Sequence, residues 1–357
     1  MTVYCGVDFH ARSQTICYCA TTDGEVRRHE LHHQKDDVRA FYQQLSGEVM
    51  VGLEASGYSS WFEEMVEGLG HKVWIGDATE IRRLARRRQK NDKRDAEHIL
   101  ELLLKAEFPR LHRQSAESRE VLRQLRYRQR LVKISTMIKN NLHAIALGAG
   151  LSLQTQLSTV KGRERLEALP LSQALAHQRE AWLGLLEGVR DQIASVERWL
   201  KGQASTDTRV ARLRTHPGVG LLTSLCLVHT LGDVSRFSTT RKVAAYAGLE
   251  PMEHSSAETK RYGAISKAGS RLLRFLLGEA AQVAVRTDDE LRAFYQRLLA
   301  RRGKAKAVVA VARKLLVRCF IMLRDEIDYA EFRRRGVAVQ GVAPSGLPAL
   351  THGLVNA

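Results

Sequence analysis

The sequence lacks a hydrophobic run long enough to cross a membrane. Its most apolar late stretch, residues 308–323, is interrupted by Arg313, Lys314 and Arg318, whereas a spanning helix needs about 20 predominantly apolar residues. The first residues are typical of a strand, not of a basic region followed by an apolar export segment. We therefore expect a soluble, cytoplasmic protein that has no membrane partner.

Cysteine is scarce, and its spacing does not suit a metal clamp. None of the five cysteines forms a pair with zinc-finger spacing. Cys17 and Cys19 are separated by one residue, which places both on one face of a strand. An odd number of cysteines without an export signal favours a reducing compartment. The sequence also contains no internal repeat.

Acidic residues are outnumbered by basic ones. The chain of 357 residues has 56 Lys and Arg against 39 Asp and Glu, a formal net charge of +17. Such an excess favours a polyanionic partner, because the release of counterions from phosphates drives association. The basic residues also cluster along the chain, which favours nucleic acid over a protein that is merely soluble and positively charged.

The first 108 residues alternate between strand and helix patterns. The expected strands are residues 3–7, 14–19, 29–33, 49–53 and 72–75, and the expected helices follow Asp36, span 59–69 and include Ile81 and Leu84. A hairpin followed by strand, helix and strand is the order of an RNase H-like α/β sheet. The alternation alone fits other α/β folds equally well.

Long helices follow from residue 115 to residue 205. The second of them repeats apolar residues with alternating spacings of four and three, namely Trp182, Leu186, Val189, Ile193, Val196 and Leu200. This pattern fits an intramolecular helical hairpin and a dimerising coiled coil equally well. The chain length indicates two or three domains at about 100–200 residues each. We expect the boundaries 1–110, 111–205 and 206–335, with a flexible tail at 336–357 that is rich in Gly and Pro.

Four acidic residues lie where a metal site would form. Asp8 ends the first strand and Glu54 ends the strand at 49–53, and such carboxylates are costly at central strands unless water or a cation reaches them. Asp92 and Asp95 begin an apolar helix at a spacing that places both on one face. If the four converge, they could hold two Mg²⁺ ions for chemistry on a phosphodiester.

A structural explanation exists for the later acids, since Asp92 suits a helix N-cap and Asp95 suits the first turn. Their surroundings favour the functional explanation. A basic run that would follow a phosphate backbone surrounds them. It consists of Arg82, Arg83, Arg86, Arg87, Arg88, Lys90, Lys93 and Arg94.

Two further segments could contact nucleic acid. Residues 213–225 are typical of a helix, a tight turn and a helix, and the Pro217–Gly220 turn would let the backbone approach a phosphate. This is a helix-hairpin-helix pattern, with an ordinary helical corner as the alternative. Ser255 and Ser256 follow in a polar loop, and a serine there would need a nearby base or metal to act as a nucleophile. Cations that could stabilise a pentacoordinate phosphorane come next, namely Lys260, Arg261, Lys267, Arg271 and Arg274.

Five motifs occur in a fixed order along nearly the whole chain. They are G-V-D at 6–8, L-E-A-S-G at 53–57, D-K-R-D-A at 92–96, P-G-V-G at 217–220, and G-L-E-P…S-S…G-A-I-S-K-A-G-S-R from 248 to 271. With these motifs the chain resembles the DEDD transposases of insertion sequences, a group that includes Piv-type DNA invertases and bridge-RNA-guided recombinases.

The resemblance implies a fold and a set of site residues. The fold is α/β plus all-α: an RNase H-like (RuvC-like) DEDD catalytic domain, a helical coiled-coil insertion, and a C-terminal helical transposase domain with the helix-hairpin-helix-like segment. The four acids, Asp8, Glu54, Asp92 and Asp95, would bind Mg²⁺, with Mn²⁺ as the alternative. Ser256 would be the nucleophile that joins to DNA. Ala257 replaces the glycine usual in the family, which leaves Ser255 as the alternative nucleophile.

The implied function is that of a DNA transposase and site-specific recombinase of an insertion sequence, acting through a covalent phosphoserine. The implied partners are double-stranded DNA at element ends and target, a guide RNA encoded by the element, and further copies of the chain in a dimer or tetramer. The implied location is the bacterial cytoplasm, at the nucleoid. One alternative is a RuvC-like junction-resolving endonuclease that uses metal-activated water. Another is a nucleic-acid-binding protein without catalytic activity.

Overall fold

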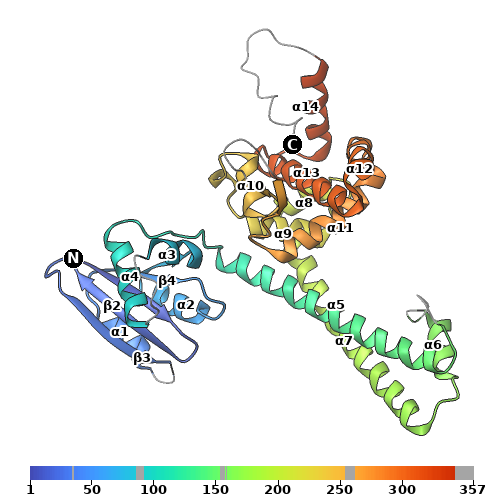
Figure 1. The fold of residues 1–357 in the computed structure, drawn as a ribbon, viewed down its shortest axis with the longest axis horizontal. Helices are drawn as coiled ribbons and strands as arrows, with labels where there is room; N and C mark the ends of the chain where they lie inside the picture. Colours follow the sequence, from blue (N-terminus) through green and yellow to red (C-terminus); the bar gives the residue numbers. More distant parts are fainter. Residues whose placement is uncertain (34–35, 86–91, 153–156, 158, 254–261, 342–357) are drawn as a thin grey trace. The chain divides into compact units, whose positions relative to one another are not determined.

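The computed structural model describes residues 1–33, 36–85, 92–152, 157, 159–253 and 262–341. The chain forms two compact units, Met1–Arg113 and a second that begins at Gln114 (Figure 1). The finer division of the second unit at residues 205 and 335 stays a prediction. No helix in the described ranges is long and apolar enough to cross a membrane.

The first unit is built on a mixed sheet of five strands in the order β3-β2-β1-β4-β5. The strands are β1 Thr2–Phe9, β2 Ser13–Ala20, β3 Val26–His32, β4 Glu48–Glu54 and β5 Lys72–Gly76. β1 pairs with β2 in antiparallel orientation and with β4 in parallel orientation. All five strands expected from the sequence are therefore confirmed, and their order is compatible with an RNase H-like domain.

Helices cover both faces of this sheet. They are α1 Asp37–Gln44, α2 Ser60–Gly68, α3 Ala78–Leu84 and α4 Asp92–Leu104. α1 and α2 share a core with the strand residues of one face, to which they contribute Val38, Tyr42, Phe62 and Val66. α4 covers the other face, where Ala96 and Leu100 pack against Cys17 and Cys19 of β2. These two cysteines share one face of their strand, as the spacing predicted, and both are buried and outside any disulfide.

A glycine in the first motif lets α4 lie directly on β1. A Cβ atom at Gly6 would lie 2.3 Å from the carbonyl oxygen of Ala96 and 2.4 Å from the backbone nitrogen of Leu100. Real Cβ atoms do not come so close to backbone atoms, so a side chain at this position would push the helix away. Gly6 therefore allows α4 to pack closely against β1, the strand that ends with Asp8 and Phe9.

The second unit contains a long helical hairpin. α5, Ala116–Gly148, packs against α7, Gln173–Ser205, with α6, Val160–Glu167, at the far end of the pair (Figure 1). The predicted apolar seam of α7 is buried or half-buried in this packing, at Trp182, Leu186, Val189, Ile193, Val196 and Leu200. α7 thus packs against α5 of its own chain, as the intramolecular interpretation predicts, and the dimerising coiled coil stays a prediction.

The rest of the second unit is a helical core with one small β-hairpin. Its elements are α8 Thr208–Arg214, α9 Leu221–Leu231, the 3-10 helix η2 Val234–Arg236, α10 Thr240–Tyr246, β6 Pro251–Glu253, β7 Tyr262–Ile265, α11 Arg271–Thr287, α12 Asp289–Arg302, α13 Lys304–Arg324 and α14 Tyr329–Gly341. The same core includes Leu122 and Leu125 of α5 and Leu200 of α7. The end of the long hairpin at which α5 begins and α7 ends is therefore part of this core.

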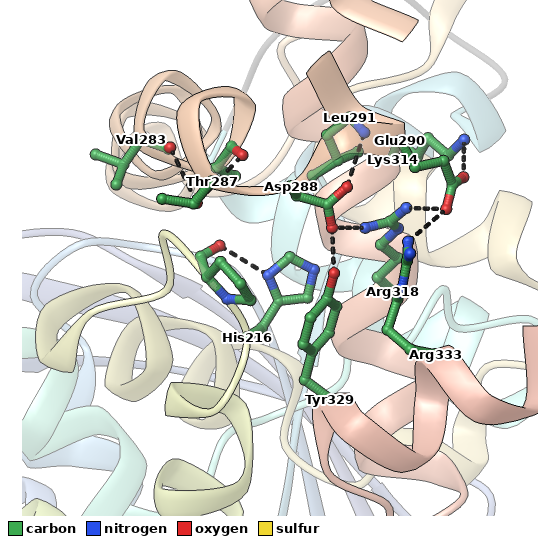
Figure 2. A network of polar contacts seen from close by, with 12 residues as sticks. His216, Val283, Thr287, Asp288, Glu290, Leu291, Lys314, Arg318, Tyr329 and Arg333 are labelled. Atoms are coloured by element: carbon green, nitrogen blue, oxygen red, sulfur yellow. Dashed lines mark hydrogen bonds and ion pairs between the residues drawn. The ribbon is translucent and has the colours of Figure 1, made fainter. Parts of the chain in front are cut away.

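A buried ionic network joins α12, α13 and α14 (Figure 2). The Asp288 carboxylate accepts hydrogen bonds from the backbone N–H of Leu291 at 2.8 Å, from Arg318 at 2.7 Å and from the Tyr329 hydroxyl. Arg318, only 3% exposed, also donates to Glu290 at 2.5 Å. Burial raises the pKa of Asp288, but its hydrogen bonds and the charge of Arg318 outweigh this effect and hold the pKa at about 2.

His216 extends this network to the turn after α8. Its ring lies 4.4 Å from that of Tyr329 (centroid to centroid), and the backbone N–H of Tyr329 donates to the hydroxyl of Thr215 at 2.9 Å. Burial lowers the pKa of His216 to about 4, so the ring is neutral at pH 7. The network thereby holds α14 against the turn that precedes α9.

Candidate active site

Two of the four predicted acids lie side by side. β1 and β4 run parallel with Val7 opposite Leu53, so the next residues, Asp8 and Glu54, come at the same level of two neighbouring strands. This is the carboxyl edge of the central strands, where sites form in α/β sheets. The side chains remain partly accessible, at 18% for Asp8 and 38% for Glu54. We call this pair and its surroundings the carboxylate edge.

Exposed basic side chains partner both acids. His10 Nε2 lies 3.1 Å from Asp8 Oδ2, and Arg82 donates from Nη2 to Glu54 Oε1 at 3.0 Å. Arg82 belongs to the basic run predicted to follow a phosphate backbone, and its side chain is 71% exposed. An ion pair this exposed contributes little stability, so Arg82 can exchange the carboxylate for a phosphate at small cost.

The other two predicted acids lie on α4. Asp92 is the first residue of the helix and Asp95 the fourth, directly before Ala96, whose carbonyl oxygen lies over Gly6. The side chain of Asp92 lies outside the described residues. Within the part of the chain that the structure describes, no three His, Cys, Asp or Glu side chains gather to hold a metal ion.

The donor chemistry nevertheless suits a divalent cation. Carboxylate oxygens are the ligands that Mg²⁺ and Mn²⁺ prefer, and Asp8 and Glu54 present such oxygens from neighbouring strand ends. Two negative groups at one edge favour a cation between them. The residues present therefore fit a metal of this class.

The predicted serines belong to the connection of a small hairpin. β6 and β7 pair in antiparallel orientation, with Pro251 opposite Ile265 and Glu253 opposite Tyr262. Ser255 and Ser256 lie in the connection between them, residues 254–261, outside the described residues. The sequence predicted a polar loop here and missed both strands, which are too short for period-two alternation to be recognised.

The two ends of this hairpin cross in direct backbone contact. Gly248 and Gly269 have φ of +68° and +74°, a region that favours glycine. A Cβ atom at Gly248 would lie 1.9 Å from the carbonyl oxygen of Ala268, and one at Gly269 would lie 2.1 Å from that of Tyr246. No side chain fits at either position. Both glycines belong to the motifs that flank the serines, which was the only sequence signal for this contact.

Arg274 closes the same crossing. Its Nη1 atom donates to the carbonyl oxygens of Ala247 at 3.2 Å, Ala268 at 2.6 Å and Gly269 at 3.2 Å. The sequence placed Arg274 among the cations that could stabilise a phosphorane. In the structure the Nη1 atom of Arg274 instead links the two ends of the hairpin through these hydrogen bonds. We call β6, β7 and this crossing the serine hairpin.

The Pro217–Gly220 turn is shaped first by helix packing. Gly218 has a φ of +85°, and a Cβ atom there would lie 2.6 Å from the carbonyl oxygen of Ala280 in α11. Gly220, at the N-cap of α9, faces open space. The first glycine thus serves the contact with α11, and only the second leaves the backbone open to a ligand. The helix-hairpin-helix role stays a prediction.

Comparisons with known proteins match both regions. A family model of DEDD transposases, described as "Transposase", matches residues 5–149, and a second, "Transposase IS116/IS110/IS902 family", matches residues 210–296. The chain is 30% identical over 311 residues to "Probable family 20 transposase" of Pseudomonas aeruginosa, a match covering 83% of this chain and 90% of that protein. The chain belongs to the IS110/IS116/IS902 family of transposases. The resemblance inferred from the five motifs is therefore confirmed.

Other relatives agree. "Transposase for insertion sequence element IS1111A" of Coxiella burnetii is 29% identical, with 77% of this chain and 79% of that protein covered. The "Pilin gene-inverting protein" of Moraxella lacunata is 31% identical over 121 residues, which is 33% of this chain and 37% of that protein. As a member of this transposase family, the protein is an enzyme that cuts and rejoins DNA.

Proposed function

We propose that this enzyme recombines DNA through a covalent phosphoserine, with Ser256 as the nucleophile and Asp8, Glu54, Asp92 and Asp95 as the ligands of divalent metal ions. The observation that carries the proposal is the position of Asp8 and Glu54 at the same level of two neighbouring strand ends. The clamped base of the serine hairpin supports it. The residues of both regions fall within the ranges that match the transposase family.

The carboxylate edge would bind the scissile phosphate. Bound Mg²⁺, or Mn²⁺ in its place, would neutralise charge on the phosphate oxygens as the transition state forms. Arg82, whose partner in the structure is Glu54, would turn to the DNA backbone when metal takes the carboxylate. Asp8 and Glu54 need no rearrangement of the backbone for this task, since the sheet already fixes them side by side.

The serine step conserves bonds. Ser256 Oγ forms a bond to phosphorus while the bond from phosphorus to one deoxyribose oxygen breaks, and the serine proton ends on the released oxygen. Attack by a hydroxyl of the new strand reverses these changes and restores the serine. A phosphodiester is exchanged for a phosphoserine and back, so no high-energy cofactor is consumed. The clamped hairpin base would limit the positions open to the serine, which lowers the entropic cost of attack.

We also propose that the enzyme works as a dimer or tetramer at the nucleoid, on the element ends and target DNA, with a guide RNA encoded by the element. The net charge of +17 supports a nucleic-acid partner. Exposed apolar residues on the long hairpin, Met137 at 50% and Leu185 at 55% exposed, support self-association. Light scattering and absorbance of the purified full chain should show a multiple of the monomer mass together with nuclease-sensitive RNA. An RNA-free monomer that still recombines DNA would refute both parts.

The decisive experiment removes one hydroxyl. Ser256→Ala should abolish the covalent protein–DNA species on a denaturing gel and leave DNA affinity nearly unchanged. Ser255→Ala is the matched control and should still form the adduct. If the two variants behave in the opposite way, Ser255 is the nucleophile. If the double variant recombines normally, the serine mechanism is wrong. If the wild type and the double variant both only nick DNA, without an adduct, metal-activated water, as in a junction-resolving endonuclease, takes the place of the serine.

A further inference from the structure

Two large aromatic side chains are exposed beside the carboxylate edge. Tyr58 and Trp61 follow Glu54 in the chain, on the connection to α2 and in its first turn, and they are 56% and 44% exposed. Large aromatic side chains contribute most when they are buried, so two exposed ones so close to a candidate active site call for a functional explanation.

A buried ring and a half-buried one pack against the two exposed rings. Phe9, the residue after Asp8, is 7% exposed, and its ring lies 5.9 Å from that of Trp61 and 6.3 Å from that of Tyr58 (centroid to centroid). His33 stacks on Phe9 at 4.8 Å and meets Trp61 edge-on at 5.1 Å. Because the supporting rings are packed, a planar ligand can stack on Trp61 with little further loss of side-chain entropy.

The strand alternation places this aromatic surface next to the acids. Successive side chains of β1 point to opposite faces of the sheet, so Asp8 faces the α4 side while Phe9 joins the core on the α1–α2 side. The aromatic surface and the carboxylate edge therefore share one end of the sheet and lie on its two sides. A DNA strand held by its phosphate at Asp8 and Glu54 would run across this end of the sheet, the end at which Tyr58 and Trp61 are exposed.

A basic side chain belongs to the same end of the sheet. Arg12, in the turn between β1 and β2, is exposed, and the backbone N–H of His33 donates to its carbonyl oxygen at 2.8 Å. Stacked rings beside cations are the combination that binds single-stranded nucleic acid, in which rings receive bases and cations follow the phosphates. An apolar side chain of a second protein would use the rings but not the charge of Arg12.

We propose that Tyr58 and Trp61 form a stacking surface for an unpaired nucleobase of the DNA strand whose phosphate lies at the carboxylate edge. The base must leave the duplex to reach the rings, so the surface selects locally opened DNA. This inference rests on the proposed function, because the base is taken to belong to the strand whose scissile phosphate binds at Asp8 and Glu54.

The test measures binding by the full-length protein without metal, so that no cleavage occurs. The probes are a thymidine 12-mer and a duplex of mixed sequence, each followed by fluorescence anisotropy. Tyr58→Ala and Trp61→Ala should each weaken binding of the single strand roughly 5- to 10-fold, the low end for a stacked base, and leave duplex binding unchanged. Trp61→Phe, which keeps a ring, should restore most of the affinity.

Trp199→Ala is the matched control, since Trp199 lies on α7 and is 38% exposed; it should bind the single strand as the wild type does. Equal affinities for Trp61→Ala and wild type would overturn the inference. So would a smaller oligomer mass for Trp61→Ala with DNA binding intact, because a second copy of the chain would then be the occupant. Asp8→Asn separates the two proposals: if it cleaves normally while Trp61→Ala still binds the single strand weakly, the proposed function fails and the stacking surface stands.

Discussion

The carboxylate edge and the serine hairpin are positioned by different physical means. Asp8 and Glu54 end two strands of a continuous five-stranded sheet, so many ladder hydrogen bonds share the task of fixing them. The serine hairpin has two short strands, and its ends are fixed by one backbone crossing at Gly248 and Gly269 and by the hydrogen bonds of Arg274. The acids should therefore tolerate local change nearby, whereas the ends of the serine hairpin depend on a few atoms.

The charged partners of the two regions differ in the same way. Arg82, at the carboxylate edge, makes an exposed ion pair with Glu54. Arg274, at the serine hairpin, donates from one nitrogen to three backbone carbonyl oxygens. Because backbone carbonyls cannot leave without unfolding the crossing, Arg274 is structural at this atom, while Arg82 is free to change partners.

The largest effect is expected from a chemical change at the carboxylate edge. Asp8→Asn keeps the shape of the side chain and removes its charge, so the strand and its ladder should stay intact. The cleavage rate should fall about 100-fold or more, since charge stabilisation of the transition state is lost, while DNA affinity stays near that of the wild type. Single-turnover cleavage on denaturing gels measures this, and wild-type turnover would make Asp8 a structural residue.

A smaller effect is expected from a purely steric change at the serine hairpin. Gly248→Ala places a Cβ atom against the carbonyl oxygen of Ala268 at a position of positive φ, which should cost on the order of 1–3 kcal/mol of strain. The covalent adduct should form about tenfold more slowly or worse, because the hairpin ends must separate.

Gly278→Ala is the control for this variant. Gly278 lies within α11, where a Cβ atom meets open space, and alanine favours a helix interior by roughly 0.5–1 kcal/mol. Adduct formation should therefore be unchanged and the thermal midpoint of unfolding equal or higher. If Gly248→Ala behaves like Gly278→Ala, the crossing does not position the serines.

The smallest effect concerns pH and the second unit alone. Burial lowers the pKa of His216 from an ordinary 6.5 to about 4. Between these two pH values the unfolded chain binds more protons at this residue than the folded chain does. The free energy of unfolding therefore falls as the pH drops below 6.5. At pH 5 the loss should be on the order of 1–2 kcal/mol. Asp288, with its pKa of about 2 against 3.8, adds a further loss below pH 3.8.

The variant His216→Phe isolates this contribution. It should flatten the decline in unfolding free energy between pH 6.5 and pH 4 and leave the carboxylate edge in the first unit unaffected. Denaturant unfolding at a series of pH values, followed by probes in each unit, measures the slope. An unchanged slope would mean that other groups carry the acid sensitivity.

Local patterns of the sequence determined the strands and helices, because burial on one face leaves a period of two or 3.6 residues. The five strands of the first unit, the long helices α5 and α7, and the acids at the ends of β1 and β4 were all recognisable in this way. Motif order was enough to predict the transposase family. Each of these features is recorded within a few neighbouring residues.

Contacts between distant segments were decided by the tertiary structure alone. Nothing near Gly248 in the sequence predicts that Ala268 lies against it, and nothing near Arg274 predicts that it binds the carbonyl oxygen of Ala247. The exposure of Tyr58 and Trp61 was equally hidden, since an aromatic residue after a strand is as compatible with the core as with the surface. Such features depend on which distant segments the fold brings together. The physical reason is that a hydrophobic pattern in the sequence indicates which face of an element is buried but not which segment covers that face.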